Sequence, residues 1–218
     1  MSTSEPVAAD QPLRLSFTEQ MKGYVAFGIS DYEQGFREGR SKESSLSVQV
    51  TILVDDVDRF VIEPNHEARA EGHVDCDGLG GRRPIESGRF NLFVDTSVEG
   101  RKQMRYHLLS SDALGHPVTL HGFKIIEDQP GIDIWRDTTE LFVRIVAGHQ
   151  DQDGNEDAGS PPIASGIIAI HLIDFLQQLT TFRVGGQTLA ARKRALDRFG
   201  RFWLGTVWDV YADGIPLT

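Results

Sequence analysis

Hydrophobic and polar residues alternate along much of the chain with a period of two. Leu46, Val48, Val50 and Ile52 share one face of residues 46–54, and polar side chains occupy the opposite face. This alternation is typical of a strand with one buried face and one solvated face. Runs rich in β-branched and aromatic residues, separated by Gly, Pro, Asp and Asn, predict strands over residues 15–27, 46–54, 68–76, 88–94, 104–109, 118–126, 141–147, 164–171 and 180–184.

Helical periodicity is strong only near the C-terminus. Within residues 189–211, Leu196, Phe199, Trp203, Val207 and Val210 recur at spacings of three and four. This spacing predicts an amphipathic helix with a stripe that faces the core. Two shorter segments are weaker candidates. Residues 30–41 suit a short helix or a polar loop, and residues 56–60 suit a single turn that an aspartate caps.

The two halves of the chain resemble each other. Residues 22–24 are similar to residues 121–123, and residues 46–50 are similar to residues 141–145. A duplication of a four-stranded unit, over residues 15–95 and 104–185, would explain the match, although short alternating strands also resemble one another by chance. Two such sheets can bury their apolar faces against each other.

The sequence therefore predicts a mainly β protein. We expect an antiparallel barrel or a two-sheet sandwich with a C-terminal amphipathic helix. The strands form a single domain over residues 13–218, and residues 1–12 are polar and acidic, which is typical of a disordered tail.

Composition and charge disfavour several classes of function. The 218 residues carry a net charge of −10, which disfavours binding to nucleic acid. The lone Cys76 excludes an internal disulfide and fits a small buried strand residue. The chain has no run of about 18 apolar residues, so we expect no transmembrane segment. The N-terminus lacks the pattern of a secretory signal, and a cytoplasmic location is expected.

Six segments carry a resemblance to a known family: FTEQMKGY at residues 17–24, FNLFVD at 90–95, LHGFK at 120–124, WRDTTEL at 135–141, DFLQQLTTFRV at 174–184 and WDVYA at 208–212. They resemble the β-rich module attached to glucose–methanol–choline oxidoreductases of the sterol-oxidase kind. The resemblance implies an association with a flavin oxidoreductase partner, and it assigns no residue roles. The chain has no Gly-x-Gly-x-x-Gly after a strand, so we expect no cofactor of its own.

Three histidines lie within predicted strands and are candidates for a ligand site. If His107, His121 and His171 face the inside of a closed barrel, they could meet with Tyr106 as a ligand pocket, a metal site or a general base. The alternative is ordinary strand histidines, because a slip of one residue reverses the face. Trp135 precedes a strand and suits either a plug at the barrel end or a pocket wall that stacks on a ligand.

Acidic clusters offer weaker candidates. Residues 151–157 superficially suggest a calcium loop, but position six is not glycine and position twelve is not glutamate, so an exposed acidic loop is favoured. Asp55, Asp56 and Asp58 could act as acid/base carboxylates, although capping of a helix is the commoner role. His73 and Asp75 share a strand face that we expect to be solvated, and no metal site is predicted.

The C-terminal helix also carries a cluster of basic residues. Arg192, Arg194, Arg198 and Arg201 could contact a membrane surface or a partner. Alternatively, the aromatic stripe seals an open end of the β structure, and the basic side chains pair with the acidic body.

These observations favour a non-catalytic module. It would bind a hydrophobic small molecule, such as a lipid or a sterol-like compound, or dock to an oxidoreductase. The alternative is a small β-barrel enzyme, of the isomerase, cyclase or hydratase type, that uses histidines or carboxylates in its lumen. The chain has no nucleophile elbow, phosphate-binding loop or zinc-finger spacing, which favours the non-catalytic interpretation.

Overall fold

A computed structural model describes residues 12–96, 101–127, 140–150, 161–170, 183–184 and 188–204. Its strands are β1 (Leu15–Phe27), β2 (Ser45–Val54), β3 (Glu67–Cys76), β4 (Gly81–Ile85), β5 (Ser87–Asp95), β6 (Arg101–Ser111), β7 (Pro117–Glu127), β8 (Glu140–Ala147), β9 (Ala164–Ala169) and β10 (Arg183–Val184). The helices are α1 (Tyr32–Ser41), α2 (Val57–Ile62) and α5 (Leu189–Leu204), with a short 3-10 turn at Asp77–Leu79.

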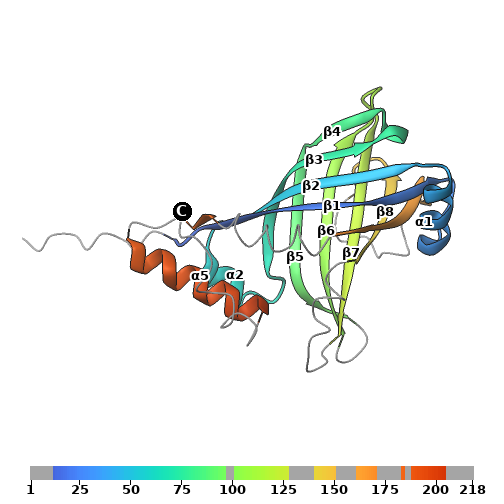
Figure 1. The fold of residues 1–218 in the computed structure, drawn as a ribbon. Coiled ribbons are helices and arrows are strands. Elements are labelled where there is room, and N and C mark those ends of the chain that lie inside the picture. The colour runs from blue at the N-terminus through green and yellow to red at the C-terminus, as the bar shows by residue number, and fades with distance from the viewer. Residues whose placement is uncertain are drawn as a thin grey trace, which may run out of the picture.

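Eight of the strands close into an antiparallel barrel (Figure 1). The order around it is β1-β2-β3-β5-β6-β7-β8-β9, and β9 returns to pair with β1 from Lys22 to Phe27. β4 pairs with the C-terminal half of β3, and β10 pairs with the first residues of β1. Of the two predicted architectures, the barrel is the one observed. The pairing of β9 with β1 closes the sheet on itself, so none of the eight strands is an edge strand along its whole length.

The alternation of apolar and polar residues predicts these strands well because each strand buries only one of its two faces. β1 begins and ends at the predicted residues, and β2, β3, β5, β6, β7 and β8 match to within a few residues. β4 was not predicted. Its sequence, GRRPI, has two arginines and a proline, and it lacks the apolar alternation on which the prediction depends.

Inward-facing side chains form the main core. They come from alternate positions of the eight strands, for example Met21, Val48, Phe90, Leu120 and Val143, each 2% exposed or less. The predicted burial of Cys76, at the end of β3, is confirmed. An eight-stranded barrel has an interior that side chains can fill or that can hold one small ligand.

Helix α1 lies on the outside of the barrel, over the seam between β1 and β9. Asp31 caps its first turn by accepting a hydrogen bond from the backbone N–H of Gln34. Gly35 and Gly39 face the strands at a spacing of four residues. A Cβ atom at Gly35 would lie 2.1 Å from the carbonyl oxygen of Ser165, and one at Gly39 would lie 2.5 Å from that of Val25. Glycine is required here because the helix backbone rests directly on the strand backbone.

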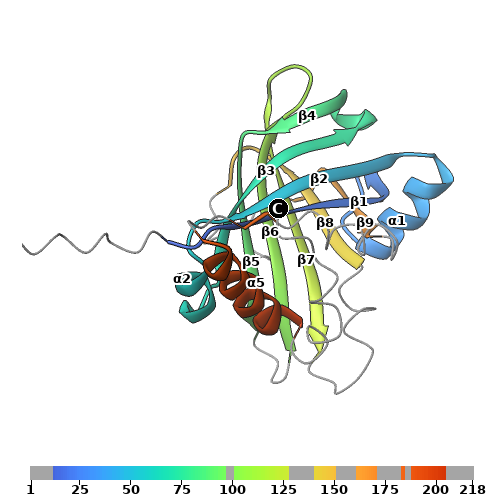
Figure 2. The ribbon, with the colours of Figure 1, turned by 60° about the vertical axis from the view of Figure 1, so that its left-hand side comes forward.

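Helices α2 and α5 pack together on the opposite side of the barrel from α1 (Figures 1 and 2). Phe199 and Trp203 of α5 are buried, and both contact Phe17 of β1, with ring centroids 5.8 and 5.1 Å apart. Phe199 also contacts Phe60 of α2. The interpretation that the aromatic stripe seals the β structure is therefore confirmed for these residues. Residues 205–211 of the predicted helix lie outside the described part of the chain.

Several expectations fall on residues that are not described. These are the N-terminal tail as far as residue 11, the acidic loop at 151–157, His171 and Trp135. The internal duplication stays a prediction. Among the helices that are described, none combines the length and the apolar character needed to cross a membrane.

Candidate functional site

Two oppositely charged side chains are buried inside the barrel. Glu19 of β1 and Lys124 of β7 are each 1% exposed. Glu19 shares its strand face with Phe17 and Met21, and Lys124 shares its face with Leu120. Because alternate residues of a strand point the same way, both side chains face the lumen. Tyr106 of β6 is 2% exposed and completes what we call the lumen cluster: Glu19, Tyr106 and Lys124.

The lumen cluster spans the barrel. β6 lies opposite β1 in the ring of eight strands, four steps away in either direction. The hydroxyl of Tyr106 donates a 2.7 Å hydrogen bond to Oε2 of Glu19 across this distance. Nζ of Lys124 lies 3.7 Å from the same oxygen and 5.5 Å from the centroid of the Tyr106 ring. One carboxylate oxygen therefore faces both a hydroxyl donor and an amine.

Burial shapes the electrostatics of the lumen cluster. Desolvation lowers the pKa of Lys124, and the neighbouring Glu19 carboxylate partly offsets this. Desolvation and the Glu19 charge raise the pKa of Tyr106 well above its usual value, so its hydroxyl keeps the proton it donates. The lumen thus holds an amine that loses its proton more readily than a surface lysine, next to a carboxylate held by a phenol.

Apolar side chains surround the lumen cluster. On the side of α5, Phe90 packs edge-on against Tyr106, with ring centroids 5.1 Å apart, and Phe17 packs against Phe90. The aromatic contacts therefore continue from Trp203 through Phe17 and Phe90 to Tyr106. Further along the inner face of β1, Met21 pairs with Val48 of β2, and on β6 and β7 the next inward residues, Leu108 and Leu120, pair with each other.

The chemical repertoire of the lumen cluster follows from these three groups. A lysine ammonium binds carboxylates and polarises carbonyl groups, and a neutral lysine amine is a nucleophile. A carboxylate with a phenol donor can receive and return a proton. Buried ion pairs are commonly no more stabilising than apolar residues of the same volume. Stability alone therefore does not explain the lumen cluster.

Two of the three candidate histidines, His107 and His121, lie within the described residues, and neither faces the lumen. His107 and His121 are direct partners across β6 and β7, and their Nδ1 atoms lie 3.4 Å apart. However, each occupies a position adjacent to an inward-facing residue, Tyr106 and Gly122 respectively, so both point to the outside of the barrel. The condition that they face the lumen is therefore not met for these two histidines, whereas their mutual contact is observed. Tyr106 faces the lumen without them.

The outer face around these histidines is basic and aromatic. In the register of the strands, His107 lies next to Arg89, and His121 lies next to Arg144. The guanidinium of Arg144 lies 4.5 Å from the ring centroid of Tyr32, from helix α1. The histidine pair therefore lies on the outer face of the sheet, away from the lumen cluster, with His107 buried at 5% exposure and His121 partly exposed.

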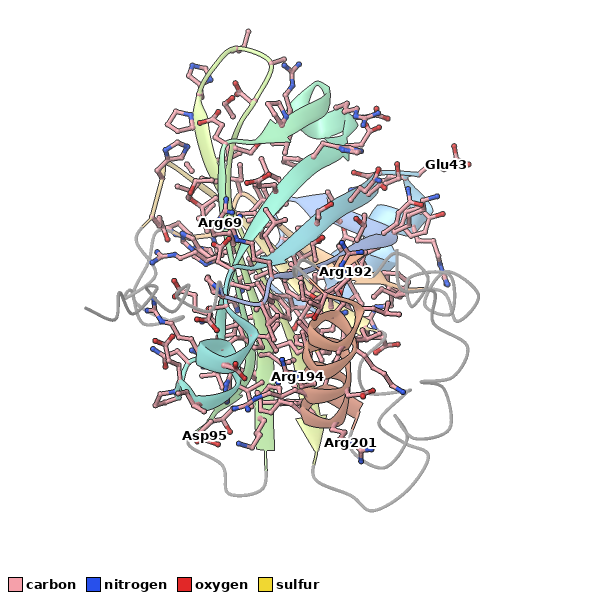
Figure 3. All side chains as sticks on the ribbon, turned by 90° about the vertical axis from the view of Figure 1, so that its left-hand side faces the viewer. Glu43, Arg69, Asp95, Arg192, Arg194 and Arg201 are labelled. Carbon is pink, nitrogen blue, oxygen red and sulfur yellow. The ribbon has the colours of Figure 1, made fainter. Side chains whose placement is uncertain are left out.

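The basic residues of α5 take different positions (Figure 3). Arg192, Arg194 and Arg201 are spread along the helix, and Arg194 and Arg201 are exposed. Nε of Arg198 lies 3.0 Å from Oδ1 of Asp58 in α2, so this side chain pairs with the acidic body as one interpretation expected. Contact of the arginines with a membrane or a partner stays a prediction.

The acidic candidates have structural roles. Asp56 accepts a hydrogen bond from the backbone N–H of Arg59 and caps α2. Asp55 accepts two hydrogen bonds from Arg69. Asp75 is exposed on the outer face of β3, and His73 beside it contacts Arg82 at 3.1 Å. The capping interpretation is thus confirmed for Asp56, and within the described residues no group of three or more His, Cys, Asp or Glu side chains is placed to hold a metal ion.

Sequence reasoning missed Glu19 and Lys124, although the sequence contains a signal for both. Glu19 falls in phase with Leu15, Phe17 and Met21, and Lys124 falls in phase with Leu120 and Ile126. A charged residue at a position that the alternation assigns to the core is unusual, whereas the predicted functional residues follow from residue type alone.

Searches of protein-family models, of curated proteins and of solved structures find no match to this chain.

Proposed function

We propose that the barrel binds a small amphiphilic molecule in its lumen. Its body is apolar, and its polar end is a carbonyl or carboxylate group that contacts Lys124. The observation that carries the proposal is the complete burial of Glu19, Tyr106 and Lys124 among apolar side chains. This refines the sequence-based expectation of a hydrophobic ligand, such as a lipid or a sterol-like compound, because a buried amine in the lumen favours a polar group on the ligand.

A matched series of ligands tests this function. We expect decanoate and decanal to bind more tightly than decane, since only the first two offer an oxygen to Lys124. A hydrogen bond to a charged group is worth about 1.5–3 kcal/mol, or roughly a tenfold to hundredfold preference in affinity. Native mass spectrometry of gently purified protein, with each ligand added, measures this preference and also detects any molecule retained from the cell.

Two variants show where the ligand binds. Replacement of the lumen cluster by apolar residues (Glu19→Leu, Tyr106→Phe and Lys124→Met together) is expected to remove the preference for the polar ligands. The control is Lys102→Met, which removes an exposed lysine that pairs with Asp95 on the surface. If none of the three ligands binds the parent protein, or if the triple variant keeps the preference, the proposed function is wrong.

An enzyme remains the second candidate, and one observation favours it. The lumen cluster combines an amine, a carboxylate and a phenol within a few ångströms, which is the composition of a general acid/base site. His107 and His121 face outward, so the residues that could carry catalysis are Glu19, Tyr106 and Lys124. Docking to a flavin oxidoreductase stays a prediction from the family resemblance.

A further inference from the structure

We propose that Lys124 forms an imine with an apolar aldehyde inside the barrel. This inference rests on the proposed function, because it requires a ligand in the lumen. It goes further by assigning covalent chemistry to one atom, Nζ of Lys124, and by naming the class of compound that reacts there.

The first requirement is a neutral amine. A lysine on the surface is almost fully protonated at neutral pH and is a poor nucleophile, whereas a desolvated lysine loses its proton more easily. Lys124 is 1% exposed in an apolar lumen, and burial lowers its pKa. The exposed Lys102, 46% accessible at its side chain, has no comparable environment.

The second requirement is a group that moves protons. Nζ attacks the carbonyl carbon, and the C=O π bond becomes a C–O single bond in a carbinolamine. The two protons of the neutral amine pass in turn to the carbonyl oxygen through Oε2 of Glu19, 3.7 Å from Nζ. The first forms the carbinolamine hydroxyl, and the second converts that hydroxyl into the departing water as the C=N bond forms. Amine and aldehyde thus give imine and one water, with no oxidant or reductant. The Tyr106 hydroxyl holds the Glu19 carboxylate in place through its 2.7 Å hydrogen bond.

The third requirement is a lumen that suits the substrate. The walls on both sides of the lumen cluster are aromatic or aliphatic, with Phe90 on one side and Met21 and Leu120 among the residues on the other. An apolar chain with one terminal carbonyl places its polar atom at Lys124 and its body along these walls. A terminal aldehyde fits better than a ketone, because its carbonyl carbon carries only one substituent at the reacting end.

Reductive trapping tests the proposal directly. The purified full-length protein is incubated with decanal and sodium cyanoborohydride, which converts an imine into a stable secondary amine. Intact mass and peptide mapping then locate the label. We expect one decyl group for each chain, at Lys124, and this label disappears in Lys124→Met and persists in Lys102→Met. Labelling of surface lysines without Lys124, or no labelling at all, would overturn the proposal.

Two further measurements distinguish activation of Lys124 by its surroundings from simple access of decanal to its amine. Glu19→Gln is expected to slow labelling about 10²-fold, since proton transfer by a positioned side chain contributes on the order of 10²–10⁴-fold. Tyr106→Phe, which acts through Glu19, is expected to slow it less. The labelling rate of Lys124 should also reach its plateau at a lower pH than that of a lysine in an unstructured peptide treated in the same way. If Lys124 and the peptide share one pH profile, the imine site is not there.

Failure of imine formation can be distinguished from failure of the proposed binding function. Retention of the preference for decanoate over decane without trapping at Lys124 would remove the imine and leave the binding function intact. Loss of both would remove both. Circular dichroism of Lys124→Met, and of the triple apolar variant if the single variant is unfolded, shows that an absent label reflects an absent amine.

Discussion

Strands β6 and β7 carry two polar groups on their opposite faces, and the two groups differ in what surrounds them. Outward, the Nδ1 atoms of the buried His107 and the partly exposed His121 lie 3.4 Å apart on the basic and aromatic outer face of the sheet. Inward, Tyr106 and Lys124 meet Glu19 from the far wall of the barrel. Tyr106 and His107 are adjacent in sequence, yet only Tyr106 enters the lumen. Residue type identifies polar positions in the sequence, whereas the phase of the strand decides which of them face the lumen.

The largest expected effect on stability comes from replacing a single residue of the lumen cluster. Lys124→Met leaves the Glu19 carboxylate buried without its cation, and we expect a loss of about 3–5 kcal/mol in the free energy of unfolding. The triple variant Glu19→Leu, Tyr106→Phe and Lys124→Met removes all the polar groups together and should be about as stable as the parent. Urea denaturation measures both variants. A single variant as stable as the parent would show that the carboxylate and amine are not buried together.

A smaller effect is expected when only the phenol is changed. Tyr106→Phe removes the hydroxyl that donates to Glu19 and leaves Lys124 beside the carboxylate, and loss of this hydrogen bond costs about 1–3 kcal/mol. The same variant should alter the pH dependence. Because the pKa of Tyr106 is raised in the folded protein, its contribution to stability is complete below about pH 10 and is lost as the pH rises above that unfolded-state value.

The dependence of stability on pH in alkaline solution tests the direction of the Tyr106 pKa shift. From pH 9 upward, the parent protein should lose more stability than Tyr106→Phe, as measured by urea denaturation at each pH. The depressed pKa of Lys124 acts in the opposite direction in both proteins, so the difference between them isolates the tyrosine. Parallel curves would contradict the buried position of the phenol.

The smallest effect is expected on the outer face. His121→Gln keeps a polar side chain at a partly exposed position, and we expect a change below about 1 kcal/mol and unchanged ligand preference. Thermal unfolding and the decanoate and decane comparison measure this. A loss of ligand preference comparable to that of the triple variant would reverse the assignment of inner and outer faces.

Much of the fold was predictable because its signals are local. The strands of the barrel alternate cleanly, and the aromatic spacing of α5 follows from a single helical face. The choice of a barrel over a sandwich required the pairing of β9 with β1, which joins segments more than 100 residues apart in sequence. No local pattern specifies such a closure.

The candidate site was less predictable because it also depends on contacts between residues that are far apart in sequence. Glu19 and Tyr106 are 87 residues apart, and only the closed ring brings their side chains together. The phase of Glu19 and Lys124 with apolar neighbours could have identified each residue as buried. Their mutual contact depends on the stagger of strands on opposite walls, which alternation does not specify.

The central claim is that the lumen cluster holds the polar end of a ligand. A crystal structure of the full-length protein soaked with decanoate tests it most directly. We predict electron density for the chain along the apolar lumen, with a carboxylate oxygen within hydrogen-bond distance of Nζ of Lys124. A lumen filled entirely by its own side chains, with decanoate bound elsewhere or nowhere, would contradict the account.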